Sequence, residues 1–420
     1  LDCYRFWWPD EQVGIIFDEL EAGRDGLRAT ISVTSDRGVV SGVVADNRRA
    51  TLIGPRWRTD LRRDLDERVP DVDWYAAIER AVSCSIQRWK LGEPVIDLRT
   101  YEQKQRPKFL LRPFLEYGKI AVLFAMGGTG KSMFGMGLGA SVASGLSVVG
   151  TTPDSAVPGL YLDWEDDEDS HVERFAAIAV GIGVERERVL SPMLYRRQYA
   201  PLVDSISQIR RIVAEHGIGF ILVDSMGAAV GGEEGREGST KLFNALRSTG
   251  CTALIIDHQV KGQEGRDGPP RPPMTPYGTV YTHNLARRIW RMDKAQEPGE
   301  SNMAISLTNT KANRTATMMP IGYRVHIDST DEDELISVRY VATDISQFMA
   351  LAVKQGNKEH IRAVLRGNGG RPMTIDQIHD AMVVDRPGDA PSAAVVAATC
   401  RRYRDRVFVG VPGGWALLQR

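Results

Sequence analysis

The chain has 420 residues, enough for two or three domains, and its 53 basic and 54 acidic residues leave a formal net charge of -1. This balance excludes binding to nucleic acid or membrane through a strong overall charge, so any such binding must come from local patches. The four cysteines stand singly, without metal-ligand spacing. No apolar stretch is long enough to cross a bilayer, and the first residues lack the order of a signal peptide. We therefore expect a cytoplasmic protein.

Residues 1–113 are predicted to form a small β-rich domain with helical residues and a linker. Four stretches with strand-like alternation lie between residues 13 and 54 and are separated by turn residues. A helical pattern covers residues 58–91, where Trp74, Ile78 and Val82 share one face with Ile86. Residues 92–113 contain three prolines and are interpreted as a connector.

Residues 114–348 are predicted to form an α/β domain. Short apolar segments, expected to be strands, occupy residues 119–125, 159–164, 219–224, 252–257, 287–292 and 303–308. Helical patterns occupy residues 131–145, 170–182, 205–217 and 240–247. Nearly continuous apolar strands that alternate with helices indicate a mostly parallel sheet covered on both faces.

Residues 349–420 differ from the central region. Helices are expected at residues 357–367, 374–382 and 392–406, followed by a hairpin at 407–420. This order is typical of a winged helix-turn-helix. The third helix ends in the basic residues Arg401, Arg402, Arg404 and Arg406. We expect it to bind duplex or forked DNA; contact with another protein is the alternative.

The stretch AMGGTGKS, residues 125–132, joins the first strand of the α/β domain to its first helix. This arrangement directs backbone N–H groups and a helix N-terminus at phosphate oxygens. The Lys131 ammonium would contact the β and γ phosphates, and the Ser132 hydroxyl would bind Mg²⁺. The predicted ATP-binding residues are Gly127, Gly128, Thr129, Gly130, Lys131, Ser132 and Met133.

Carboxylates follow two further strands. Asp224 ends the strand at 219–224 and is expected to hold magnesium together with Ser132. In GLYLDWEDDED, residues 159–169, one carboxylate could polarise the water that attacks the γ-phosphate. Glu165 is the preferred candidate and Asp163 the alternative. Most of residues 166–169 are explained as an acidic loop that caps the next helix.

The order AMGGTGKS, DWE, LVDS and DHQVKG resembles that of the RecA-type ATPases, in particular their RepA-like hexameric helicase branch, AAA family ATPases of plasmid and phage type. The resemblance covers about residues 114–344. It implies a RecA-like core that hydrolyses ATP with Mg²⁺ and works as a ring or filament, with each ATP between two subunits. It also implies that Glu165 and Lys131 are catalytic and that His258, or its neighbour Gln259, senses the γ-phosphate.

The same resemblance implies basic fingers that reach the ATP of a neighbouring subunit. The segment SLTNTKANRT supplies Lys311 and Arg314, and Arg287 and Arg288 are further candidates. It further implies that the loops at residues 227–240 and 262–279 line a central channel and grip single-stranded DNA. The candidate DNA contacts around the second loop are Lys261, Arg266 and Arg271.

The leading hypothesis is therefore a ring-forming ATPase, by resemblance a hexamer, that moves along DNA and acts as a helicase in replication or repair. One alternative is a recombinase or recombination mediator whose filament ATP stabilises. The other is a DNA-binding regulator whose oligomeric state ATP controls.

Overall fold

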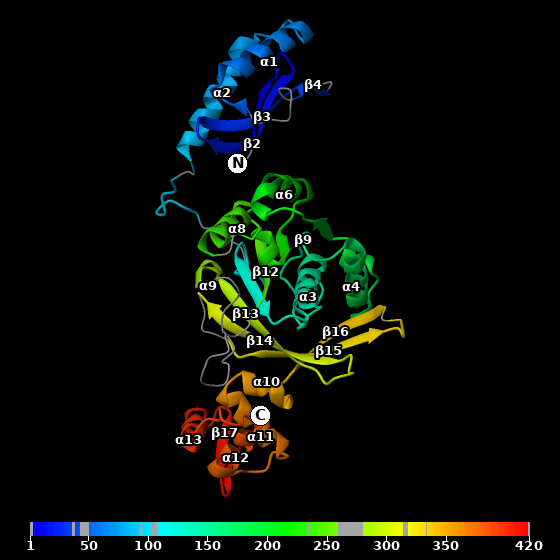
Figure 1. The fold of residues 1–420 in the computed structure, drawn as a ribbon, viewed down its shortest axis with the longest axis vertical. Helices are drawn as coiled ribbons and strands as arrows, with labels where there is room; N and C mark the ends of the chain where they lie inside the picture. Colours follow the sequence, from blue (N-terminus) through cyan, green and yellow to red (C-terminus); the bar gives the residue numbers. More distant parts are fainter. Residues whose placement is uncertain are drawn as a thin grey trace. The chain divides into compact units, whose positions relative to one another are not determined.

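The computed structural model describes residues 3–35, 38–42, 50–92, 95–102, 107–232, 235–258, 280–313, 318–332 and 334–418. The chain divides into two compact units, Leu1–Gln105 and Arg106–Arg420 (Figure 1). Within the described residues, no helix combines the length and the apolar character that crossing a bilayer requires.

The first unit confirms the predicted N-terminal β-rich domain. Its antiparallel sheet has the order β1 (Cys3–Trp8), β2 (Val13–Gly23), β3 (Gly26–Ser35) and β4 (Gly38–Gly42), and the short β5 (Ala50–Thr51) pairs with β3. The structure divides the helical pattern into α1 (Pro55–Arg68) and α2 (Trp74–Leu91), and the Asp73 carboxylate caps α2 by accepting the N–H of Ala76. The predicted α2 face is buried against the sheet through Trp74, Ile78 and Val82. The sequence analysis did not identify β1.

The second unit contains a nine-stranded sheet that confirms the predicted α/β class. Its spatial order is β10-β9-β11-β12-β8-β13-β14-β15-β16. The strands from β10 to β13 are parallel, whereas β13 to β16 are antiparallel. The bounds are β8 (Ile120–Ala125), β9 (Gly159–Asp163), β10 (Met193–Arg197), β11 (Phe220–Asp224), β12 (Thr252–His258), β13 (Arg288–Ala295), β14 (Met303–Ala312), β15 (Ile321–Ser329) and β16 (Leu335–Thr343).

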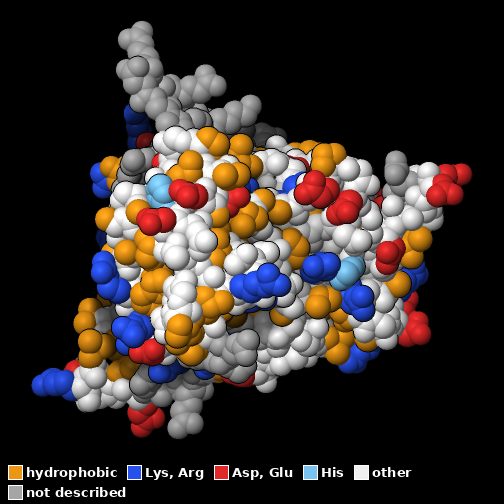
Figure 2. Space-filling model, turned by 90° about the horizontal axis from the view of Figure 1, so that it is seen from below, with side chains coloured by type: hydrophobic (Ala, Val, Ile, Leu, Met, Phe, Trp, Pro, Cys, Tyr) orange, Lys and Arg blue, Asp and Glu red, His pale blue; other side chains and the backbone are white. Residues whose placement is uncertain are grey.

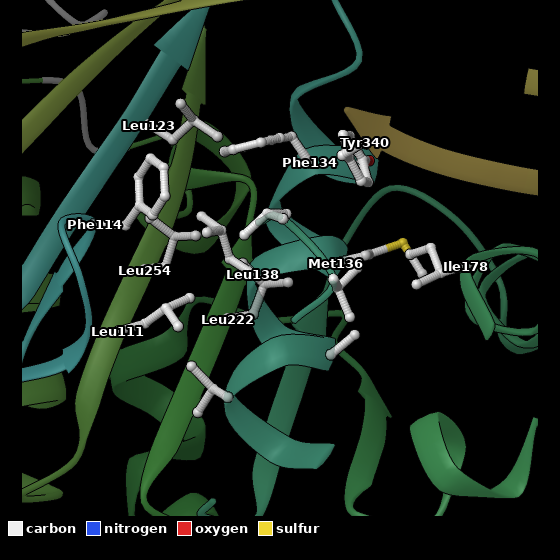
Figure 3. Packing of buried hydrophobic residues seen from close by; sticks show 14 of the residues in the cluster. Leu111, Phe114, Leu123, Phe134, Met136, Leu138, Ile178, Leu222, Leu254 and Tyr340 are labelled. Carbon is white, nitrogen blue, oxygen red and sulfur yellow. The ribbon is translucent and has the colours of Figure 1, made fainter. Parts of the chain in front are cut away.

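Helices cover both faces of this sheet (Figure 1). On one face lie α3 (Lys131–Ser144), α4 (Glu168–Gly181) and α5 (Glu187–Leu190). On the other lie α6 (Leu202–His216), α7 (Met226–Ala229) and α8 (Arg236–Ser248), with α9 (Val280–Leu285) next to α8. Side chains alternate along β8 between the two cores, with Leu123 in the first and Val122 in the second. Figure 3 shows the first core, where Phe134 and Leu138 of α3 pack against the strands.

The remaining elements of the second unit lie before and after the large sheet. A two-stranded sheet, β6 (Phe109–Leu111) and β7 (Leu115–Glu116), precedes β8. After β16 come η1 (Ile345–Gln347), α10 (Met349–Lys354), α11 (Asn357–Gly367), α12 (Ile375–Asp385), α13 (Ala393–Arg402), β17 (Phe408–Val411) and β18 (Gly414–Leu417).

The three C-terminal helices and the hairpin share a small core of their own. It includes Ile361 of α11, Ile378 of α12, Val396 of α13 and Phe408 of β17. The elements follow one another in the predicted order, and their description as a winged helix-turn-helix stays a prediction. Arg362 and Arg366 of α11 both donate to Oδ2 of Asp344, at 2.7 Å, which ties this part to the end of β16.

Candidate nucleotide site

The glycine-rich loop joins β8 to α3 with a backbone that two of its glycines make possible. Gly128 and Gly130 have φ angles of 67° and 88°, in the left-handed region that side chains disfavour. Gly130 is the N-cap of α3. A Cβ atom there would lie 3.0 Å from Cε of Met303, the end of a flexible side chain, so it is chiefly the backbone conformation that favours glycine at this position.

Lys131 lies at the start of α3 with its ammonium turned back over the loop. Nζ donates to the carbonyl oxygen of Met126, at 3.0 Å, and lies 3.5 Å from Nδ1 of His258. Burial lowers the pKa of Lys131, and the negative charges of Asp224, Glu165 and Asp257 oppose this effect. The ammonium is therefore held beside the loop among carboxylates.

The predicted site residues gather around one open cavity of about 490 Å³. Among those that line it are Gly128, Thr129, Gly130, Lys131, Ser132, Met133, Glu165, Asp224 and His258. Gly127 belongs to the loop but is not among the residues that line this cavity. Segments that are far apart in the sequence are thus brought to the carboxyl edge of the parallel strands, where phosphate sites of α/β sheets form.

The residues Ser132 and Asp224 fit a magnesium site. Asp224 is buried, and its Oδ2 accepts a hydrogen bond from the Tyr161 hydroxyl at 2.8 Å. Its Oδ1 has no hydrogen-bond partner among the described residues. Burial raises the pKa of Asp224, and the Ser132 hydroxyl lowers it, so a cation at this carboxylate would offset the cost of burial. Magnesium commonly takes one or two protein oxygens and completes its shell with phosphates and water.

The geometry favours Glu165 over Asp163 as the group that could contact water. Asp163 is 1% exposed, and its carboxylate accepts the backbone N–H groups of Glu165 and Asp166 at 3.2 and 3.0 Å. The Glu165 side chain, in contrast, is 45% exposed and lines the cavity. Its Oε1 accepts a hydrogen bond from the Ser225 hydroxyl and lies 3.6 Å from Nε2 of His258. His258 thus lies between Glu165 and Lys131.

The acidic residues after Glu165 have the expected structural role. Asp167 caps α4 by accepting the N–H of Ser170 at 2.9 Å, and Asp166 pairs with Arg174 of α4 at 2.8 Å.

Sequence reasoning missed several polar residues around the cavity. His171 and Arg174 line it from α4, and Tyr161 lies behind Asp224. Asp257, next to His258, is buried, and burial raises its pKa to about 7 although the N–H of His258 and the charge of Lys131 lower it. The position of Asp257 at the end of a predicted strand could have indicated a site residue. Tyr161 lies within an apolar run, and nothing in that run indicates a site residue.

The basic finger candidates lie near the amino ends of the parallel strands, whereas the cavity lies at their carboxyl ends. Lys311 donates from Nζ to the carbonyl oxygens of His283 and Asn284 at the end of α9. Burial lowers its pKa, and so does the charge of Arg287, which places these two candidates near each other. Arg287 is exposed.

Arg288 does not fit the prediction that it reaches a neighbouring subunit. Its side chain is 1% exposed, and its Nη2 lies 3.1 Å from Oε1 of the buried Glu116. The guanidinium also lies over the ring of Phe109. Alternate side chains of a strand point to opposite faces, and the sequence alone does not tell which of two adjacent arginines is buried.

Several predicted contacts lie outside the described residues: Gln259, Lys261, Arg266, Arg271 and Arg314. The basic C-terminal candidates Arg401, Arg402, Arg404 and Arg406 are described, and all four are exposed. The Arg402 guanidinium lies over the Tyr403 ring, and that of Arg404 over Trp415 of β18. Figure 2 shows that basic side chains form separate groups on the face it displays, with acidic and hydrophobic ones between them.

Comparison with known proteins bears on the region that forms this cavity. Residues 90–264 match a family model described as an AAA domain, and they include the glycine-rich loop, Glu165, Asp224 and His258. The match covers less than half of the chain. The matched region ends six residues after His258, and the family model does not extend to β13 and the strands that follow.

Two solved structures are similar to part of the chain at low identity. A KaiC-like protein from the hyperthermophilic archaeon Pyrococcus horikoshii has 17% identity and a TM-score of 0.36, over 55% of this chain and 93% of that one. A RadB recombinase has 16% identity and a TM-score of 0.37, over 53% of this chain and 91% of that one. The comparison with curated proteins gave no match. The RepA-like branch stays a prediction.

Proposed function

We propose that the protein is a ring-forming, magnesium-dependent ATPase that moves along DNA, most simply a helicase of RepA-like type in replication or repair. The observation that carries this proposal is the cavity that Lys131, Ser132, Asp224, Glu165 and His258 share. We retain residues 1–113, 114–348 and 349–420 as the N-terminal, ATPase and winged-helix domains.

In this proposal the loop and its neighbours bind the phosphates and stabilise charge on the transferring phosphoryl group. The ammonium of Lys131 moves from the Met126 carbonyl oxygen to the β and γ phosphates. Ser132 and Asp224 hold Mg²⁺, which neutralises phosphate charge when it is bound. Glu165 orients the attacking water, a role that suits its exposure in the cavity.

His258 is proposed to report the loss of the γ-phosphate. Its two ring nitrogens lie 3.5 Å from Nζ of Lys131 and 3.6 Å from Oε1 of Glu165. A change at either partner therefore acts on the same imidazole ring. His258 ends β12 and directly precedes the segment proposed to grip single-stranded DNA, so movement of the ring can be passed to that segment.

The position of the finger candidates supports a site shared between subunits. Arg288 pairs with Ala121 near the start of β8, and Lys311 pairs with Ile289. The phosphate loop follows Ala125, about 13 Å further along the strand direction. Lys311 and Arg287 therefore lie too far from the loop of their own chain to contact its phosphates. A neighbouring subunit in a head-to-tail ring could bring them there.

DNA contact is proposed at two places. Single-stranded DNA would pass the two loops after Asp224 and His258, and duplex or forked DNA would meet the exposed arginines of α13 and the residues after it. Phosphate contacts of this kind weaken as salt rises, so binding through Arg401 and Arg402 is expected to depend steeply on ionic strength.

A strand-displacement assay on a forked duplex tests the proposal, with Lys131→Ala as the hydrolysis-negative control. We expect ATP-dependent unwinding by the native chain and none by the variant. DNA-stimulated hydrolysis without unwinding, together with open filaments in electron micrographs, would replace the helicase by a recombinase. Binding to a specific duplex without DNA-stimulated hydrolysis would indicate a regulator. Full hydrolysis by Lys131→Ala would refute the site assignment itself.

A further inference from the structure

The turn that carries Glu165 is built around the carboxylate of Asp163. Oδ1 of Asp163 accepts the N–H of Glu165, and Oδ2 accepts the N–H of Asp166. Oδ2 also accepts a hydrogen bond from the Tyr195 hydroxyl at 3.1 Å and lies 3.1 Å from Nε2 of His171. The buried carboxylate thus joins the turn after β9 to side chains from α4 and β10.

His171 is placed to act on this carboxylate. Its side chain is 3% exposed, and its ring packs against those of Tyr161 and Tyr195, with centroids 4.5 and 5.1 Å away. Among the described residues, neither ring nitrogen of His171 makes a hydrogen bond of good geometry, and the nearest polar partner of Nε2 is the Asp163 carboxylate at 3.1 Å. The Asp163 contact is therefore the polar contact that can explain why an imidazole is buried at this position.

The contacts around Asp163 keep it charged in spite of its burial. Burial alone raises the pKa of Asp163, but the close contact of His171 and the hydrogen bonds from the two turn N–H groups outweigh this effect and lower the pKa. A charged carboxylate accepts backbone N–H groups more strongly than a neutral one. The imidazole of His171, 3.1 Å from this carboxylate, therefore strengthens the two bonds that hold the turn.

We propose that His171 is a positioning residue for ATP hydrolysis, which acts through Asp163 to fix the turn that places Glu165 in the cavity. The inference rests on the proposed role of Glu165. Tyr195 supports the same turn from the other side, because its hydroxyl is also within hydrogen-bond distance of the carbonyl oxygen of Asp166, at 3.2 Å. His171 and Tyr195 together hold both polar sides of the turn backbone.

Removal of the donor should slow hydrolysis more than it weakens ATP binding. His171→Phe keeps an aromatic ring against the two tyrosines but loses the nitrogen that contacts Asp163. We expect kcat to fall by about tenfold to a hundredfold, the range expected when a catalytic group is displaced by about 1 Å. The KM for ATP and the affinity for a fluorescent ATP analogue should change less than threefold. His171→Gln, which can place an N–H near the same carboxylate, should restore part of kcat.

The decisive experiment is a double-mutant cycle in the full-length chain with Glu165→Gln, followed by single-turnover hydrolysis. If His171 acts through Glu165, His171→Phe has no further effect once Glu165 has been replaced. If His171→Phe does not fold, Tyr195→Phe takes its place in the cycle. We expect it to show the same pattern, with no further effect once Glu165 has been replaced.

Each contrary outcome points to a different conclusion. An equal loss of kcat in both backgrounds, or a lowered affinity for the ATP analogue with kcat unchanged, would overturn the positioning role of His171. Full turnover by Glu165→Gln would instead refute the proposed function of Glu165 and leave the hydrogen bonds of the turn as a structural feature. Native turnover by both His171→Phe and Tyr195→Phe beside an inactive Glu165→Gln would overturn this inference alone.

Discussion

Arg287 and Arg288 provide a matched test, because they are adjacent in sequence but differ in environment. Arg287 is exposed, whereas Arg288 is buried with its guanidinium 3.1 Å from the buried Glu116 carboxylate. Replacement of Arg288 by alanine leaves that carboxylate charged and without its ion-pair partner. Breaking a buried pair in this way costs about 3–5 kcal/mol of unfolding free energy. The same change at Arg287 is expected to cost less than about 0.5 kcal/mol, as is usual at an exposed position.

The loss of ATP hydrolysis should have the opposite order to the loss of stability, with the larger loss in Arg287→Ala. Arg287→Ala is expected to fold normally and to lose most ATP hydrolysis, because it removes a finger that acts on the neighbouring subunit. Arg288→Ala is expected to lower the thermal unfolding midpoint by roughly 5–10 °C. A double variant, Arg288→Met with Glu116→Gln, should recover much of this loss because it removes both buried charges.

Mixed assemblies decide whether the finger acts between subunits. Lys131→Ala and Arg287→Ala proteins should each be inactive alone. In an equal mixture, about one interface in four combines an intact Lys131 with an intact Arg287, so about a quarter of the native rate should return for a head-to-tail ring. Hydrolysis by size-fractionated assemblies gives the measurement. Two outcomes would contradict a site shared between subunits. In the first, Arg287→Ala is inactive alone and the mixture is inactive as well. In the second, Arg287→Ala hydrolyses ATP at the native rate.

Three further predictions concern the cavity. Gly130→Ala should lower ATP-analogue affinity and cost about 1–2 kcal/mol, because φ is 88°, whereas Gly127→Ala, with no neighbouring atom within 4 Å, should leave stability unchanged in thermal melts. Tyr161→Phe removes the 2.8 Å hydrogen bond to Asp224 and should lower the unfolding free energy in urea by about 1–3 kcal/mol. Burial raises the pKa of Asp257 to about 7, so its stabilising contribution is lost as pH rises from 4 through 7. The unfolding free energy of Asp257→Asn relative to that of the native chain should therefore rise by about 1 kcal/mol or more from pH 4 to pH 8. Urea titrations at both pH values would measure it. The same difference between variant and native chain at both pH values would contradict this prediction.

Elements whose apolar residues repeat with a clear period could be predicted from the sequence. The helix at residues 357–367 agrees with α11, because its buried residues Ile361, Val364 and Leu365 recur at helical spacing. The strands β8, β9, β11 and β12 are continuously apolar, since both of their faces are buried. The strands β10, β15 and β16 were missed. They mix charged and apolar residues because they lie at or near an edge of the sheet, where one face or one edge meets solvent.

The site shows a similar division. Lys131 and Ser132 begin the helix after β8, and Asp224 ends β11. Residues at the carboxyl ends of parallel strands meet at one edge of the sheet whatever the connecting segments do. Asp163 and Glu165 are two residues apart, and their different roles depend on burial, which the local sequence does not encode. The proposed role of His171 depends on its contacts with Asp163 and with two tyrosines from different strands, so it could be recognised only from the three-dimensional structure.

The arrangement explains why one chain is expected to hold only half of a working site. The groups proposed to bind phosphate and position water lie at the carboxyl edge of the parallel strands, while Lys311 and Arg287 lie toward the opposite edge. Lys311 is fixed there by the carbonyl oxygens at the end of α9, so a large movement within one chain would break those bonds. Rotation of a whole neighbouring subunit can bring the basic groups to the phosphates without such a loss. Hydrolysis would then depend on the contact between subunits, and loss of each γ-phosphate would loosen that contact. Loosening at one contact after another around the ring is the physical requirement for movement along DNA.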